Sequence, residues 1–182
     1  MVTKSIVINR SFLETQSFNY LTQSFCQLSS VSRDYPNFRH WFNHTVVPGI
    51  YYNKRFLCLK VISQEIVAIA ILKNSFLEKK ICTLWVDNNF KGLGLGNELF
   101  NQSFDLLKTS NPMITISSTK IDEFEHLLDE YNFQIYAAYD SFYVQGVTEL
   151  SFNGYLSKQS PLSSNLKADL SFNSMLQPSL SY

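Results

Sequence analysis

The stretch from residue 81 to residue 107 constrains the fold most, because it joins an apolar run, a glycine-rich turn and an amphipathic segment without a break. Residues 81–86 are mostly apolar and predict a buried strand. Glycine then occupies alternate positions, at Gly92, Gly94 and Gly96. The apolar residues that follow recur mostly at helical spacing. They are Leu95, Leu99, Phe100, Phe104, Leu106 and Leu107.

A glycine turn between a strand and a helix start can bind an anion. Glycine lets the backbone turn tightly and approach a ligand, while the free amides and the positive end of the helix dipole attract phosphate. A turn without any ligand is the alternative, and the flanking strand and helix favour the anion site. The spacing is G-x-G-x-G, so it lacks the G-x-G-x-x-G of dinucleotide sites, and no Gly-Lys-Ser/Thr of a P-loop follows.

Length and composition favour one folded domain with a tail. The chain has 182 residues, of which 45% are hydrophobic. Basic and acidic residues number 15 each and form no basic stripe, so we expect no nucleic-acid partner. We find neither a bilayer-spanning apolar segment nor a signal peptide, and we expect a cytoplasmic protein without membrane contact. Cys26, Cys58 and Cys82 are odd in number and widely spaced, which indicates free thiols.

The chain ahead of the glycine turn predicts a short strand over 5–9, two helices and an antiparallel meander. The first helix runs from Ser11 to about residue 28, with Ser11 and Glu14 forming a capping box. The second helix opens at Asp34-Tyr-Pro36 and ends at Pro48-Gly49. The strands of the meander are predicted over 56–62, 66–72 and 81–86.

After the glycine turn the pattern predicts a crossover. A helix to about residue 108 and a strand over 113–117 follow, so the strands that begin at Ile81 and Met113 should be parallel neighbours. The remaining predicted elements are a helix over 122–131 and hairpin strands over 134–139 and 142–147. We expect an α/β (α+β) domain over residues 1–156, with a mixed sheet of about six to seven strands and about four helices. The serine- and leucine-rich residues 157–182 predict a mobile tail.

Leu84-x-Val86 followed by Lys91-Gly-Leu-Gly94-Leu-Gly96 resembles the acetyl-CoA motif of the GCN5-related N-acetyltransferase (GNAT) family. The order of elements over residues 1–154 is similar as well. The resemblance implies that a strand splayed from its parallel neighbour pairs with the pantetheine arm of acetyl-CoA, and that the glycine loop holds the CoA pyrophosphate. The implied strand residues are Leu84, Trp85 and Val86, and the implied loop residues are Lys91, Gly92, Leu93, Gly94, Leu95, Gly96 and Asn97.

The resemblance also implies transfer of an acetyl group to a primary amine by direct attack in a ternary complex. The family often has a tyrosine that protonates the thiolate at the position of Leu128, and Tyr131 lies on nearly the same helical face. Tyr131 is therefore the candidate acid, with a core aromatic as the alternative. Lys91 stands where Arg or Gln is usual, and residues 81–86 lack the carboxylate that is the base of many members. A non-catalytic acyl-CoA sensor or partner-binding module on the same fold is the alternative function.

The acceptor pocket of such a fold lies between the early helices and the closing hairpin, which makes several aromatic residues candidates for its wall. They are Tyr35, Phe38, Trp41, His44 and Tyr51. These side chains suit an apolar or cationic acceptor, and they suit a hydrophobic core equally. His40 and His44 have the i, i+4 spacing of a metal site, but no third ligand is evident nearby, so we expect no metal. A homodimer stays an open alternative.

Overall fold

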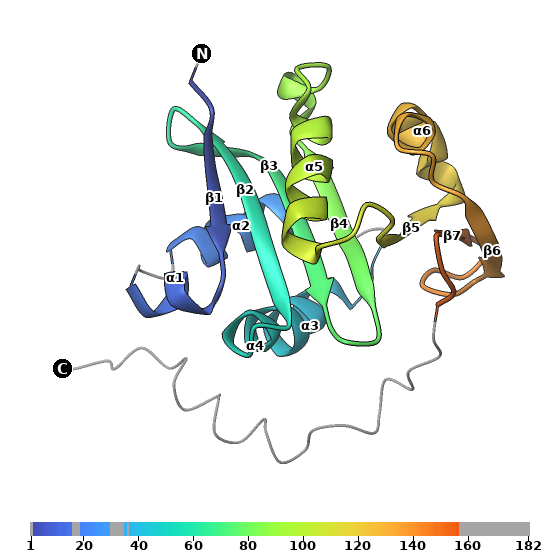
Figure 1. Cartoon of the computed structure of the whole chain (residues 1–182), viewed down its shortest axis with the longest axis horizontal. Helices are drawn as coiled ribbons and strands as arrows, with labels where there is room; N and C mark the ends of the chain where they lie inside the picture. Colours follow the sequence, from blue (N-terminus) through green and yellow to red (C-terminus); the bar gives the residue numbers. More distant parts are fainter. Residues whose placement is uncertain (1, 16–18, 30–34, 36, 157–182) are drawn as a thin grey trace.

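The computed structural model describes residues 2–15, 19–29, 35 and 37–156. Within these residues, seven strands form one mixed sheet in the order β1-β2-β3-β4-β5-β7-β6 (Figure 1). The strands are β1 Lys4–Ile8, β2 Arg55–Ile62, β3 Glu65–Asn74, β4 Lys79–Val86, β5 Met113–Ser117, β6 Ile135–Asp140 and β7 Thr148–Phe152. The α-helices are α1 Arg10–Thr15, α2 Asn19–Leu28, α3 Phe38–Trp41, α4 Val47–Tyr51, α5 Leu95–Leu107 and α6 Ile121–Glu130. This is the predicted α/β class.

Strands β1 to β4 form the predicted antiparallel meander, and β4 and β5 form the predicted parallel pair. The parallel pairing is short, because only Lys80 with Met113 and Ile81 with Ile114 are in register. Beyond these pairs β4 continues to Val86 without β5 beside it. We call the point where the two strands separate the fork. Figure 1 shows β5, β7 and β6 diverging from β4.

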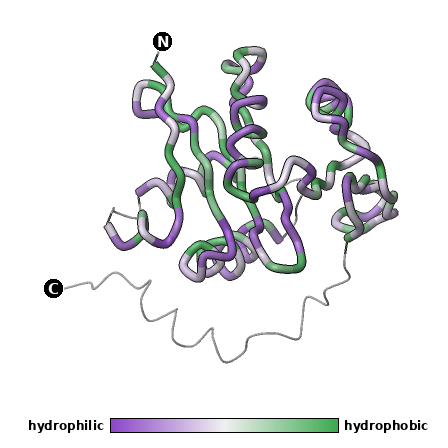
Figure 2. Tube along the Cα trace, in the orientation of Figure 1, coloured by the Kyte–Doolittle hydropathy of each residue, from purple (hydrophilic) through white to green (hydrophobic). Residues whose placement is uncertain are grey.

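Both faces of the meander are covered by helices, and each face has its own hydrophobic core. Helix α5 lies in front of the central strands in Figure 1 and α2 lies behind them. Leu99 and Phe100 of α5 belong to the first core, whereas Phe38 and Ile50 belong to the second. Residues 66–72 of β3 are buried throughout, as expected for a strand that is covered on both faces. Figure 2 shows the apolar runs along these central strands.

The first predicted helix begins differently from the prediction. Helix α1 begins at Arg10, and Asn9 caps it, since its Oδ1 accepts a hydrogen bond of 3.0 Å from the Phe12 N–H. Glu14 pairs with Arg10 at 2.9 Å. The predicted Ser11–Glu14 capping box is therefore wrong, because the helix starts ahead of Ser11. Helix α1 ends at Thr15 and α2 begins at Asn19, with residues 16–18 outside the described part.

The second predicted helix does not end at Pro48-Gly49. A π-helical segment, Phe42–Val46, leads directly into α4, which continues to Tyr51. Pro48 lies in the first turn of α4, directly after this π-helical segment. The helix start predicted at Asp34 and Pro36 lies outside the described residues.

The last predicted hairpin strand is also wrong. Residues 142–147 form a loop, in which Ser141 Oγ accepts a hydrogen bond of 2.9 Å from the Gly146 N–H. The strand is β7, which lies between β5 and β6 rather than at the sheet edge. Leu150 and Phe152 of β7 pack in the α5 core, so the alternating polar residues face the opposite side.

Residues 157–182 lie outside the described part, and the predicted tail stays a prediction. Among the described helices, none has the length and apolarity needed to cross a membrane.

Candidate functional site

The glycine turn after β4 has an open surface. Gly92 and Gly94 have φ angles of 77° and 78°, in the left-handed region that favours glycine. A Cβ atom added to either residue would meet nothing within 4 Å. Gly94 is the N-cap of α5, and the Glu98 amide makes the first helical bond back to its carbonyl at 3.0 Å. The amides of residues 95–97 precede that bond and are available to an anion.

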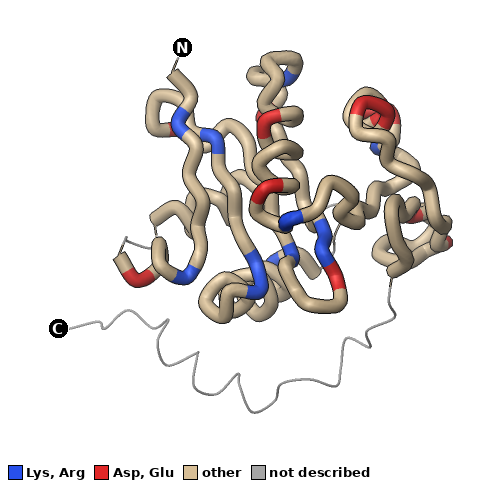
Figure 3. Tube along the Cα trace, in the orientation of Figure 1, with Lys and Arg blue, Asp and Glu red and all other residues tan. Residues whose placement is uncertain are grey.

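The third glycine, Gly96, lies where α5 and α6 pack against each other. A Cβ on Gly96 would lie 3.3 Å from Leu127 Cδ1, so α6 approaches α5 closely here. Two polar contacts join α6 to the same turn. Lys91 Nζ lies 2.8 Å from Glu123 Oε2, and Asn97 Nδ2 donates to Glu130 Oε2 at 2.6 Å. Figure 3 shows the acidic residues gathered on α6, which places negative charge beside the candidate anion site.

The strand edge beside the fork is open to a ligand. Leu84, Trp85 and Val86 pair with β3 on one side only and are partly exposed. The β3–β4 pairing has a bulge at Cys82, which lies directly after the last parallel pair with β5. An unpaired edge of this kind can bind an extended amide-containing arm by β-augmentation. The turn and the open edge thus adjoin one another along β4.

Comparison with solved structures supports the same architecture. A probable acetyltransferase from Staphylococcus epidermidis gives a TM-score of 0.55 at 14% identity, covering 83% of this chain and 97% of that chain. A proposed acetyltransferase of the GNAT family from Desulfovibrio desulfuricans gives a TM-score of 0.55 at 10% identity, and the match covers 82% of this chain and 97% of that chain. The chain has the GNAT fold. A proposed streptothricin acetyltransferase from Bacillus anthracis, in complex with acetyl coenzyme A, gives 0.52 at 14% identity, covering 59% of this chain and 67% of its own. No family model and no curated protein matches the sequence.

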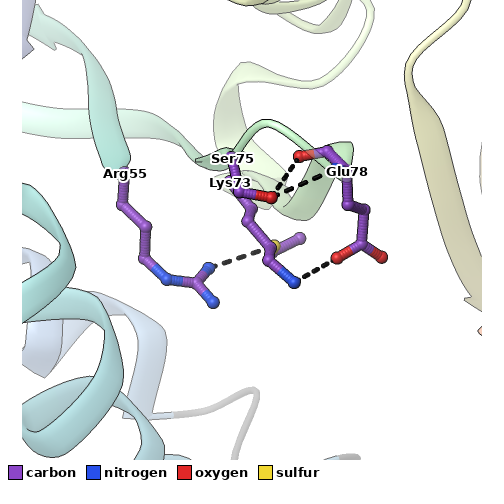
Figure 4. Close-up of polar contacts among 5 residues, drawn as sticks. Arg55, Lys73, Ser75 and Glu78 are labelled. Atoms are coloured by element: carbon purple, nitrogen blue, oxygen red, sulfur yellow. Dashed lines mark hydrogen bonds and ion pairs between the residues drawn. The ribbon is translucent and has the colours of Figure 1, made fainter. Parts of the chain in front are cut away.

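On the face of the GNAT sheet opposite α5, a buried polar cluster lies near the start of β4. Arg55 is 8% exposed, and its Nη1 donates to Cys82 Sγ at 3.2 Å. Its guanidinium also lies 5.6 Å from the centre of the Trp41 ring. Lys73 forms an ion pair with Glu78 beside it (Figure 4). A thiol and an aromatic ring are weak partners for a cation, so these two contacts compensate the buried charge of Arg55 only in part.

Polar residues continue along this face from β4 across the fork to β7. Lys80, Thr115, Glu149 and Ser151 are all buried. Burial lowers the pKa of Lys80, and the charges of Cys82, Glu78 and Glu149 oppose that effect. Sequence reasoning missed these residues. The alternation of polar and apolar residues in β7 was an available signal, although it normally indicates a solvent-exposed face.

Tyr131, the candidate acid, ends α6 and packs on α5. Its ring centre lies 5.4 Å from that of Phe100, nearly parallel at 22°, and 5.2 Å from that of Phe104. Leu128, at the position where the family often has tyrosine, is buried in the same core. The ring of Tyr131 is thus fixed by aromatic contacts, as the core-aromatic alternative requires.

The five acceptor-wall candidates do not converge on one site. Tyr35 contacts Tyr143 of the β6–β7 loop, with ring centres 5.2 Å apart. Phe38 is a core residue, and Trp41 packs on Arg55. Tyr51 lies on the surface under Arg10. His44 and His40 stack with ring centres 4.3 Å apart, and within the described residues no group of three or more metal-ligating side chains forms.

A depression of about 520 Å³ opens beside the end of β4, on the α2 side. Its lining residues are Cys26, Gln27, Trp85, Asp87, Asn88 and Asn89. Trp85 therefore borders both this depression and the open strand edge.

Proposed function

We propose that this protein transfers an acetyl group from acetyl-CoA to a primary amine of a small molecule or a protein. The observation that carries the proposal is the adjacency of the open glycine turn and the open β4 edge. One site offers amides to a diphosphate, and the other offers a strand edge to an amide-bearing arm. Coenzyme A contains both groups in that order. The acetyl coenzyme A complex of the similar Bacillus anthracis protein supports the same donor.

In this proposal the backbone from Lys91 to Asn97 binds the pyrophosphate, and Leu84, Trp85 and Val86 bind the pantetheine arm. Catalysis depends mainly on orientation, because holding the amine against the thioester makes the attack effectively unimolecular. The amine attacks the acetyl carbon directly in a ternary complex, without an acetylated enzyme. Tyr131 is the proposed donor of the proton that the departing thiolate takes up.

The cysteines bear on the cellular location of the protein, and the distribution of charge bears on its acceptor. The cysteines among the described residues are free thiols, which is typical of a reducing compartment and supports our proposal of a cytoplasmic protein. Figure 3 shows Lys and Arg spread over several strands rather than gathered in one patch, and acidic residues on α5 and α6, which supports an acceptor other than nucleic acid.

The second candidate function is a non-catalytic acyl-CoA-binding module. The specific observation in its favour is that β4 offers no carboxylate as a base along its open edge, which consists of Thr83, Leu84, Trp85 and Val86.

The test combines calorimetry of acetyl-CoA binding with thiol release across a panel of primary amines. Binding with turnover of at least one amine supports the transferase, and the Tyr131→Phe variant should then turn over more slowly. Binding without turnover on any amine favours the module. Absence of binding overturns both.

A further inference from the structure

The fork carries a polar surface on the face opposite α5. Ile114 and Ile116 of β5 pack in the α5 core, so Thr115 between them faces the other side. Cys82 of β4 packs in the opposite core and shares that side. Glu149 of β7 does so as well, since Leu150 next to it packs with α5. These groups therefore flank the fork from three neighbouring strands.

Tyr143 lies over this surface. It comes from the β6–β7 loop, and its ring is fixed by Tyr35 and Phe142, with centres 5.2 and 4.8 Å away. Its hydroxyl is within hydrogen-bonding reach of the Thr115 side chain. The residue is 37% exposed overall, and the interaction with Thr115 places its hydroxyl beside β5. The hydroxyl thus reaches the first residue of β5 beyond the parallel pairs.

The proposed donor site predicts where the thioester lies, and this inference rests on that proposed function. The pyrophosphate binds after the C-terminal end of β4. An extended arm that runs back along β4 from there carries its reactive end toward Cys82, where β5 blocks the edge. Tyr143 and Thr115 stand at that end of the open edge.

We propose that the Tyr143 hydroxyl, held by Thr115, donates a hydrogen bond to the carbonyl oxygen of the bound acetyl thioester. The amine nitrogen forms its bond to the acetyl carbon while the C=O electron pair moves onto oxygen. When the carbonyl re-forms, the C–S bond breaks and sulfur leaves with the electron pair. The nitrogen loses one proton and the sulfur gains one. Tyr143 stabilises the charge on oxygen and keeps its own proton.

The surroundings of Tyr143 suit a donor that does not ionise. Burial raises the pKa of Tyr143, and the nearby charges of Glu149, Cys82 and Glu78 raise it further, whereas the hydrogen bond with Thr115 lowers it. The other charged groups on this face are Lys80, whose own pKa is lowered by burial, and the cations Lys73 and Arg55. The phenol therefore stays protonated at neutral pH and is available as a donor.

The test is an NMR measurement that needs no acceptor. Acetyl-CoA labelled with ¹³C at the acetyl carbonyl is bound to the full chain, because a hydrogen bond to the oxygen moves this resonance downfield. We expect a downfield shift with the wild type and a smaller one with Tyr143→Phe, which keeps the ring contacts. The matched control is Tyr136→Phe, since Tyr136 is an exposed β6 residue that packs on Tyr155. With an active amine, Tyr143→Phe should also lower kcat by about 10²-fold at unchanged KM for acetyl-CoA.

Each outcome decides the proposal. Equal affinities with a reduced shift in Tyr143→Phe alone support it. Identical resonances in the wild type and Tyr143→Phe, or a wild-type resonance at the position of free acetyl-CoA, overturn the role of Tyr143 and leave the proposed donor site intact. Failure of the wild type to bind acetyl-CoA overturns the proposed function itself.

Discussion

Lys91, at the start of the glycine turn, and Glu123, in the first turn of α6, form an ion pair with Nζ and Oε2 2.8 Å apart. Both side chains are half exposed, so the pair contributes little to stability. The ion pair matters more for binding of the proposed ligand, coenzyme A. Lys91 is the cation of the proposed pyrophosphate loop, and a carboxylate already holds it. The ligand must therefore compete with Glu123 for Lys91.

We expect Glu123→Gln to tighten CoA binding about two- to fivefold at low salt, because it releases Lys91 and removes a negative charge beside the diphosphate. Calorimetry at two salt concentrations measures the effect, which should shrink as salt screens the charges. The control is Glu125→Gln, which removes the same charge from an exposed position on the same helix. Equal gains in both variants would show that only net charge matters.

The left-handed glycines allow a matched pair of variants. Gly94 and Gly146 share a φ of 78°, and an added Cβ meets nothing within 4 Å at either. We expect Gly94→Glu and Gly146→Glu to cost similar stability, about 1–2 kcal/mol, because each forces a side chain into the left-handed region. Only Gly94→Glu should abolish CoA binding, since it places bulk and negative charge in the proposed phosphate cradle. Unchanged CoA affinity in Gly94→Glu would contradict the site.

The meander, the glycine turn and the parallel pair could be predicted because their signals are local and agree with one another. The loop over 142–147 could not. Phe142, Tyr143 and Val144 have high strand propensity, but propensity for strands yields to tertiary context. Here Tyr143 packs on Tyr35, far away in the sequence, and Gly146 turns the chain back. The strand then starts later than its most strand-like residues.

The buried polar face of the fork could not be predicted from the sequence for a different reason. Thr115 and Glu149 alternate with apolar residues, and that pattern normally indicates a solvent-exposed face. Their burial depends on which loops fold over the sheet, which a single sequence does not reveal. The burial of Arg55 could not be predicted either, because its weak partners Cys82 and Trp41 come from two distant elements.

The thiols should differ sharply in reactivity. Cys26 is exposed, whereas Cys58 is buried, and burial raises its pKa to about 12. The thiolate is the reactive form, so at pH 8 iodoacetamide should label Cys26 and leave Cys58 unmodified in the folded protein. Peptide mass spectrometry before and after urea unfolding measures this. Labelling of Cys58 at the rate of Cys26 without denaturant would contradict the burial.

The same pKa difference predicts a pH dependence of stability. An unfolded chain ionises Cys58 near its ordinary pKa of 9.0, whereas the folded chain holds the proton until about 12. The folded state thus binds more protons in between, so the contribution of Cys58 is complete below pH 9 and is lost as pH rises through that window. Cys58→Ala should reduce the loss of stability between pH 9 and pH 11, measured by urea unfolding. If the stability of Cys58→Ala falls as steeply with pH as that of the wild type, the ionisation of Cys58 is not the cause of the loss.

An ion pair to β2 anchors α5, the helix that follows the glycine turn. Lys60 of β2 is 4% exposed, and its Nζ lies 2.7 Å from Glu98 Oε2 and 2.9 Å from Ser5 Oγ. A buried ammonium left with one hydroxyl is costly. Glu98 is half exposed, so water can take its place in part, and we expect Glu98→Gln to cost about 1–2 kcal/mol. Asp105→Asn, an exposed acid on the same helix, should change stability by less than about 0.5 kcal/mol.

A double variant separates the ion pair from the loss of a charge. Lys60→Met removes the buried cation, so adding Glu98→Gln to it should cost much less than Glu98→Gln alone. Urea unfolding of the four proteins in this cycle gives the coupling energy. A coupling near zero would mean that the contact adds nothing to stability. A clear coupling, together with weaker CoA binding in Glu98→Gln, would show that Lys60 holds the helix start in the position that the ligand requires.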